Sequence, residues 1–286
     1  MRHFIKGAAL SAIVAGMLAG CGGGTSTKPT VTVKPKSAGK KDVAANGGNS
    51  KKTEPAAAAG GYGSLAGKVL FTGNNPMLAP LILMGKSPRD PAVCAVNMNI
   101  PDQSIEVDAN GGLANVFIFL DKAPAGTKMP AEVKPIDFDQ KGCIFTTHAL
   151  FAQTGQQILV KSSDAVSHNT HTYPLRNNPS NFTIKPNDQV GVPLVYEKAE
   201  REPFEVKCDI HTWMRAFHLA LDHPYCAVTQ KDGSFEIQDL PAGKHSLKIW
   251  HEKASGGFLE RAYDATIEAD KPTEVTISVD GAKFGL

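Results

Sequence analysis

Short apolar segments that alternate with turn residues fill the chain from Ser64 to its end, and they restrict the fold more than any other feature. Examples are "GKVLFTG", "ANVFIFLDK", "QQILVKSSD" and "TEVTISVD", and Gly, Pro, Asn or Asp stands between them. A period near two is typical of strands with one buried face. No window has the pattern of an amphipathic helix of three turns. We therefore predict an all-β chain built from sandwiches.

The first 20 residues have the pattern of a secretory signal peptide. Basic Arg2 and Lys6 precede an apolar run over residues 7–18. This run is too short for a membrane-spanning helix, so we predict that residues 1–20 direct export.

The signal ends in "LAGC", which resembles a bacterial lipobox. The resemblance implies that Cys21 becomes the lipid-modified N-terminus of a protein on the periplasmic side of the bacterial cell envelope. Gly22 follows where an Asp would favour the inner membrane, so the outer membrane is the expected address. The alternative is an ordinary signal peptide cut near Ala19.

Residues 21–61 consist mainly of Gly, Ala, Ser, Thr, Pro and Lys, with almost no large apolar side chain. Such a segment cannot bury enough surface to fold, so we predict a disordered tether. Residues 1–61 carry a formal charge of +7 while the whole chain carries +2, which leaves −5 for residues 62–286. A mildly acidic folded part without a basic cluster argues against a nucleic-acid partner.

The C-terminal part of the chain has the pattern of a small sandwich of its own. Residues 226–280 include "DGSFEIQDLPAGKHSLKIWH", and this stretch resembles the transthyretin-like, carboxypeptidase-regulatory-like β modules. Such a module needs about seven strands, and residues 226–280 supply four or five. We predict one sandwich over 62–222 and a smaller one over 223–286. The segment 65–76 looks like a first strand of the smaller unit, which would interleave the two.

The cysteines of an exported chain need an explanation, because thiols oxidise outside the cell. Cys94 and Cys143 lie in loop-like surroundings, and we expect a disulfide between them, with two free thiols as the alternative. Cys226 lies in a strand and fits a small buried apolar residue. Cys208 then remains, either as a metal-bound thiolate or in a disulfide with one of the other three.

The stretch "FEVKCDIHTWMRAF" places Cys208, His211 and Met214 within seven positions. Copper that cycles between two oxidation states is held well by two imidazoles, one thiolate and a weak thioether. The second imidazole must come from elsewhere in the chain, and the candidate is His168, which Asn169 follows in "SSDAVSHNTH".

An "HN" pair about forty residues before a strand and a Cys-x2-His-x2-Met loop resembles the cupredoxins, with the loop spacing of amicyanin. The match covers about residues 145–222. It implies a Greek-key β-sandwich and a second role for Asn169, which would hydrogen-bond to the Cys loop. It also implies one type 1 copper ion with four protein ligands: His168, Cys208, His211 and Met214.

The resemblance further implies that His211 reaches the surface beside Trp213 and serves as the electron port. His171 and His148 are alternative ligands. His171 would face away from His168 on a regular strand, and His148 fits a strand histidine without a metal.

These observations predict a lipid-anchored, non-enzymatic electron carrier whose partner is a cytochrome c, a dehydrogenase or a reductase of the envelope. One alternative is a copper-storage or copper-handling protein. Another is a structural β-sandwich lipoprotein with Cys208 in a disulfide, or with zinc at Cys208, His211 and His218 or His223.

Overall fold

The computed structural model describes residues 60–286. The predicted signal peptide, the lipidated Cys21 and nearly all of the predicted tether lie outside the described residues. Within the described part, no helix has the length and apolar character needed to cross a membrane.

The prediction of an all-β chain is confirmed. The described residues form fifteen strands and end in one short 3-10 helix, η1 (Gly281–Phe284). The strands are β1 (Tyr62–Thr72), β2 (Phe117–Leu120), β3 (Ile136–Gln140), β4 (Ala149–Gln153), β5 (Gln157–Ser162), β6 (His168–Thr172), β7 (Asn181–Ile184), β8 (Val192–Val195), β9 (Phe204–Lys207), β10 (Arg215–Leu221), β11 (Cys226–Val228), β12 (Ser234–Pro241), β13 (Gly243–Trp250), β14 (Phe258–Ile267) and β15 (Pro272–Asp280).

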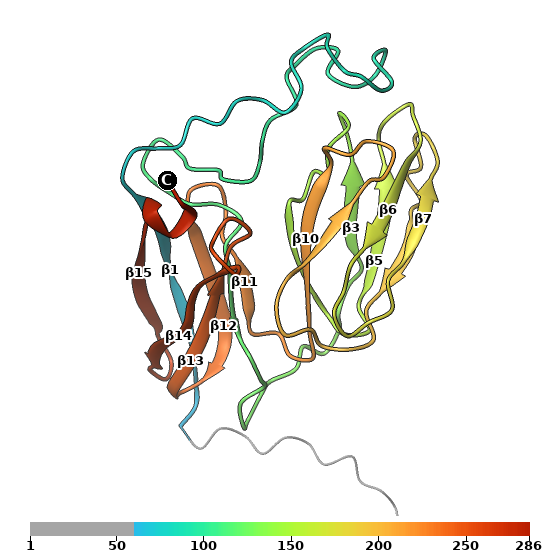
Figure 1. The fold of residues 1–286 in the computed structure, drawn as a ribbon. Helices are drawn as coiled ribbons and strands as arrows, with labels where there is room; N and C mark the ends of the chain where they lie inside the picture. The colour runs from blue at the N-terminus through green and yellow to red at the C-terminus, as the bar shows by residue number, and fades with distance from the viewer. Residues whose placement is uncertain (1–59) are drawn as a thin grey trace, which may run out of the picture. The chain divides into compact units, whose positions relative to one another are not determined.

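The central part of the chain forms a sandwich of two sheets (Figure 1). One sheet has the order β4-β10-β9-β6-β7 and the other β3-β5-β8. Their apolar faces meet in one buried cluster, to which Phe138 and Val160 contribute from one sheet and Phe204 and Val206 from the other. Phe204 and Val206 alternate with half-buried residues along β9, so the period of two in "FEVK" does place one face in the core.

A second pair of sheets has the orders β12-β1-β15 and β11-β2-β13-β14. The segment 65–76, which the sequence offered as a strand of the C-terminal unit, begins within β1, which pairs with β12 and β15. β2 likewise pairs with β11 and β13. This pair of sheets therefore combines β1 and β2, from the predicted range 62–222, with strands from the predicted range 223–286. Hydrogen bonds join β1 and β2 to strands more than a hundred residues away.

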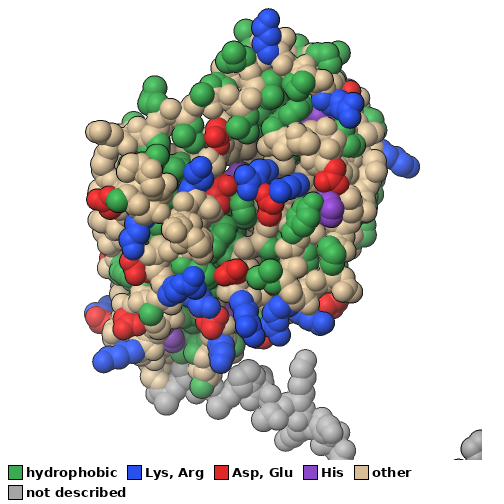
Figure 2. All heavy atoms as spheres, viewed as in Figure 1, with side chains coloured by type: hydrophobic (Ala, Val, Ile, Leu, Met, Phe, Trp, Pro, Cys, Tyr) green, Lys and Arg blue, Asp and Glu red, His purple; other side chains and the backbone are tan. Residues whose placement is uncertain are grey.

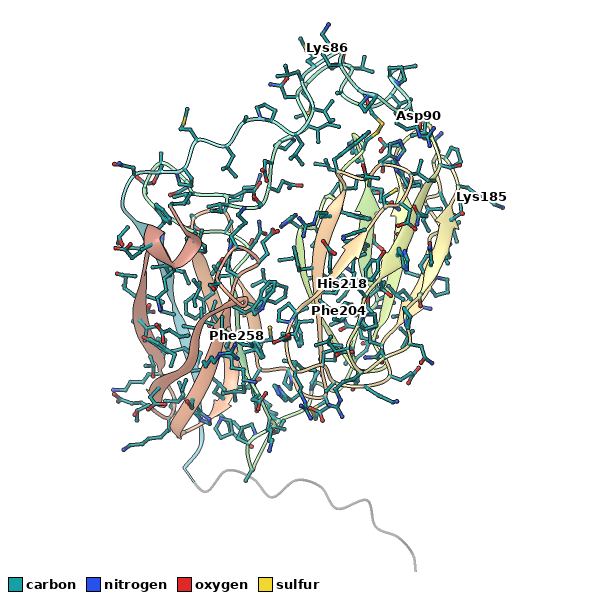
Figure 3. The ribbon with its side chains drawn as sticks, viewed as in Figure 1. Lys86, Asp90, Lys185, Phe204, His218 and Phe258 are labelled. Atoms are coloured by element: carbon teal, nitrogen blue, oxygen red, sulfur yellow. A yellow bond between two sulfur atoms is a disulfide. The ribbon has the colours of Figure 1, made fainter. Side chains whose placement is uncertain are left out.

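A fully buried histidine, His218, lies in the core of the central sandwich. The ring of His218 on β10 packs edge-on against Phe138 at 4.6 Å between centroids, and it lies near Phe204, as Figure 3 shows. Burial lowers the pKa of His218 to about 3, so the ring is neutral. Its Nδ1 pairs with the hydroxyl of Tyr196 at 2.9 Å. His218 thus packs inside the central sandwich, which we call the first sandwich. This position argues against its use as a zinc ligand.

Residues 82–100 form a loop that we call the disulfide loop. Its ends pair through a bridge between Ile82 and Ile100. The predicted disulfide is confirmed: Cys94 is bonded to Cys143, which precedes β4. The bond fastens this loop to the first sandwich.

Candidate metal centre

The loop from Cys208 to Met214 connects the antiparallel strands β9 and β10. Its two ends are joined, because the N–H of Cys208 donates to the carbonyl of Met214 at 3.2 Å. The N–H of Met214 in turn donates to the carbonyl of His211 at 2.8 Å. These contacts fold the seven residues back on themselves and bring Cys208 and His211 close together.

The first histidine arrives from the neighbouring strand. β6 pairs antiparallel with β9 at Thr172–Val206, which puts the start of β6 beside the loop that follows β9. His168 therefore faces His211, and their Nδ1 atoms are 3.0 Å apart. The Sγ of Cys208 lies 3.8 Å from the Nδ1 of His211. Donor atoms of all three residues lie within 4.8 Å of one another, and all three side chains are buried.

The thiol of Cys208 is held as a thiolate. Burial raises its pKa, but the contacts with the imidazoles of His168 and His211 and the hydrogen bonds from two backbone N–H groups outweigh burial and lower it to about 6. The backbone donors belong to Asn169, at 3.5 Å, and to His211, at 3.4 Å. A thiolate is the form that binds metals.

Each of the two imidazoles also contacts a carboxylate through its outer nitrogen. The Nε2 of His168 lies 2.9 Å from Asp164, and the Nε2 of His211 lies 2.9 Å from Asp90. Asp164 also accepts hydrogen bonds from the N–H groups of Gly142 and Cys143. Burial raises the pKa of Asp164, but the bond to His168 and these two N–H groups outweigh it and hold that pKa below its usual value.

This arrangement fixes where the protons lie. A carboxylate can only accept, so both Nε2 atoms carry hydrogen and both Nδ1 lone pairs turn toward each other. Two nitrogens 3.0 Å apart need one proton between them. Burial lowers the pKa of His168, but hydrogen bonds to Asp164 and Cys208 outweigh it and raise it to about 9, so this ring carries the extra proton. Two imidazole nitrogens and one thiolate thus converge on one point, and such a donor set fits a metal cation.

Asn169 contacts the loop that contains Cys208. Its Oδ1 accepts a hydrogen bond from the backbone N–H of Asp209 at 2.7 Å and lies 3.3 Å from the Sγ of Cys208. Its amide nitrogen donates to the carboxylate of Asp209 at 2.9 Å and to the amide oxygen of Asn181 at 2.8 Å. The side chain therefore holds the Cys208 end of the loop against β6.

The two alternative ligands are not in the cluster. His171 turns to the opposite side of β6, where its Nδ1 lies 3.0 Å from Asp209 and 2.9 Å from the hydroxyl of Tyr173. His148 pairs instead with Glu252, and both of these side chains are 7% exposed. Strand alternation explains His171, and the partner carboxylate explains His148.

Met214 and Trp213 complete the surroundings of the loop. Met214 is 1% exposed and lies in the same apolar cluster as Cys208. The ring of Trp213 lies edge-on to His211 with centroids 5.2 Å apart, and its Nε1 donates to the carbonyl of Cys143 at 2.9 Å.

The expected surface position of His211 is wrong for this chain. Its side chain is 0% exposed, because Asp90 from the disulfide loop covers its outer nitrogen and Trp213 lies beside it. Sequence reasoning also missed both carboxylates. Asp164 could have been found four residues before His168, but Asp90 is 121 positions from His211 and stands in no recognisable motif.

A scan of models of protein families gives no match, and a search of curated proteins gives none either. Several solved structures are weakly similar. An oxidised amicyanin variant with a proline-to-glycine substitution matches at 17% identity and a TM-score of 0.27, over 36% of this chain and 97% of its own. An oxidised methionine-to-leucine variant of amicyanin matches at 18% identity and 0.27, over 37% and 98%. A copper-containing nitrite reductase from Thermus scotoductus matches at 18% identity and 0.25, over 35% and 26%.

Proposed function

We propose that this protein binds one copper ion as a type 1 centre and carries single electrons. His168, Cys208 and His211 would hold the ion, with Met214 as a weak fourth ligand. The observation that carries the proposal is the convergence of two Nδ1 atoms and one thiolate within 4.8 Å in a buried site. Two imidazoles, a thiolate and a thioether are the donors that suit both oxidation states of copper.

The side chains around these donors would keep the site from rearranging. Asp164 and Asp90 hold the outer nitrogens of the two imidazoles, and Asn169 holds the thiolate loop. When bound, copper supplies a one-electron couple between Cu(II) and Cu(I). A donor set fixed before the electron arrives needs little reorganisation, which favours fast transfer without bond making or breaking.

A carrier fits these residues better than an enzyme. If all four protein donors bind the ion, no position is left for a substrate. Because His211 is buried, an electron would enter or leave through the residues that cover it and not through an exposed imidazole edge.

The cellular location of the protein and its redox partner are proposals from the sequence. A lipid on Cys21 and a tether over 21–61 would hold the protein at the periplasmic side of the cell envelope, with the outer membrane favoured. A c-type cytochrome, a dehydrogenase or a reductase would then exchange electrons with it. The transthyretin-like assignment of the second pair of sheets is likewise a proposal.

A cycling experiment separates an electron carrier from a copper-handling protein. The full chain is loaded with one equivalent of copper, reduced with ascorbate in the presence of a Cu(I) chelator, and reoxidised with ferricyanide. We expect the copper to stay bound through repeated cycles, because the same donors serve both oxidation states. Transfer of the copper to the chelator on the first reduction would instead identify a storage or handling protein.

A further inference from the structure

Asp90 reaches the candidate metal centre from a part of the chain outside all fifteen strands. It belongs to the disulfide loop, and Figure 3 shows it at the end of the molecule where the disulfide is drawn. Its carbonyl accepts hydrogen bonds from the N–H of Val93 at 2.9 Å and of Cys94 at 2.8 Å. Its φ of 45° is in the left-handed region, which is uncommon for a residue other than Gly. The backbone at Asp90 is thus held in one unusual turn next to the disulfide.

This turn directs the carboxylate of Asp90 to a single partner at the site. Its Oδ2 lies 2.9 Å from the Nε2 of His211. The His211 ring is 0% exposed while the Asp90 side chain is 38% exposed, so the carboxylate stands between the imidazole and water. The sulfur atoms of Cys94 and Cys143 lie within 4.8 Å of a His211 nitrogen.

We propose that Asp90 is a positioning residue for His211 and, through it, lowers the reduction potential of the centre. This inference rests on the proposed copper function. The carboxylate keeps hydrogen on Nε2 and therefore leaves the Nδ1 lone pair free for a metal. It also makes the imidazole more basic, as carboxylates do when they accept from a metal-bound histidine. A more basic ligand and a nearby negative charge stabilise Cu(II) more than Cu(I).

Substitutions at Asp90 separate its charge from its shape. In the full chain, Asp90→Asn keeps the size of the side chain but removes the charge, Asp90→Ala removes the contact, and Asp90→Glu keeps the charge. We expect Asp90→Asn and Asp90→Ala to weaken Cu(II) binding relative to Cu(I) binding about tenfold, which raises the potential by about 59 mV. Asp90→Glu is expected to restore part of the shift.

Arg89→Gln is the matched control. Arg89 is the exposed neighbour of Asp90 on the same loop, and its substitution removes a charge that makes no contact with His211. An exposed charge is largely screened at physiological salt, so we expect its effect on the potential to be much smaller than that of Asp90→Asn. A shift of similar size in both variants, with opposite sign, would show a general field effect and overturn a role for the contact.

A measurement on the metal-free protein tests the contact without copper. In nitrogen-15 NMR spectra of the wild type, we expect the Nε2–H of His211 to be protected from exchange with water, and we expect the protection to be lost in Asp90→Ala. Unchanged protection would overturn the inference, as would an unchanged potential in Asp90→Asn. A wild-type chain that binds no copper but keeps the protected Nε2–H would contradict the proposed function while leaving the histidine contact in place.

Discussion

Asp164→Ala is expected to lower the free energy of unfolding of the metal-free protein by about 3–5 kcal/mol, as the loss of one member of a buried pair does. The Asp164 side chain is 6% exposed and accepts from His168 and from the N–H groups of Gly142 and Cys143. Without it, the imidazole of His168 and the N–H groups of Gly142 and Cys143 lose their acceptor. Cu(II) affinity should also fall about 10–100-fold, because His168 loses the partner that orients it. Urea unfolding and a competition titration measure the two effects.

Two further variants make this result specific. Asp164→Asn keeps one acceptor oxygen and should cost less than Asp164→Ala. Asp232→Ala removes a carboxylate whose side chain is 51% exposed and which pairs with Lys68 and accepts from Ser234, and the loss of such surface contacts is expected to cost much less stability. Equal stability losses in Asp164→Ala and Asp232→Ala would show that the buried carboxylate does not hold the site together.

Removing the Cys94–Cys143 disulfide by a double substitution to Ala is expected to cost about 2–5 kcal/mol of stability. The bond closes the segment from Cys94 to Cys143, a sequence separation of 49, and its loss gives that segment more conformational freedom in the unfolded chain. It also releases the turn at Asp90 and the carbonyl of Cys143 that Trp213 contacts. The reduction potential should therefore rise as it does in Asp90→Asn.

Cys226→Ala provides the control for the loss of a cysteine. Cys226 is a free, buried thiol on β11, and it lies in a different apolar cluster from Cys208 and Met214. Its substitution should change stability by only about 1 kcal/mol and leave the potential unchanged. If the double variant and Cys226→Ala show the same change in stability and the same reduction potential, the disulfide loop has no role at the copper centre.

Local patterns in the sequence predicted the strands of the site well. The alternation in "FEVK" predicted β9, and the neighbouring Asn169 favoured His168 over His171. The structure puts His168 in the cluster and turns His171 to Asp209, as alternation along a strand requires. These features depend on residues close together in the chain, so a single sequence contains them.

Contacts between distant segments were harder to predict. The expected surface exposure of His211 was wrong because the disulfide loop, more than a hundred residues earlier, covers it. The pairing of β2 with β11 and β13 also had no local signal. The alternative of a Cys208 disulfide is not found among the described residues, where Cys208 and Cys226 are free. Its thiolate is held by imidazoles and N–H groups instead.

The face of the molecule drawn in Figure 2 carries charged side chains of both signs. On the face drawn there, Lys and Arg side chains are interspersed with Asp and Glu. A surface of mixed charge gives no single-signed field to steer a redox protein.

The most direct test of the account is the visible and electron paramagnetic resonance spectrum of the full chain titrated with Cu(II). We expect one equivalent to give an intense visible thiolate-to-copper band and a narrow copper hyperfine splitting, both abolished by Cys208→Ser, because the thiolate is the ligand that produces them. A colourless product, or a band that Cys208→Ser leaves unchanged, would contradict a type 1 copper centre.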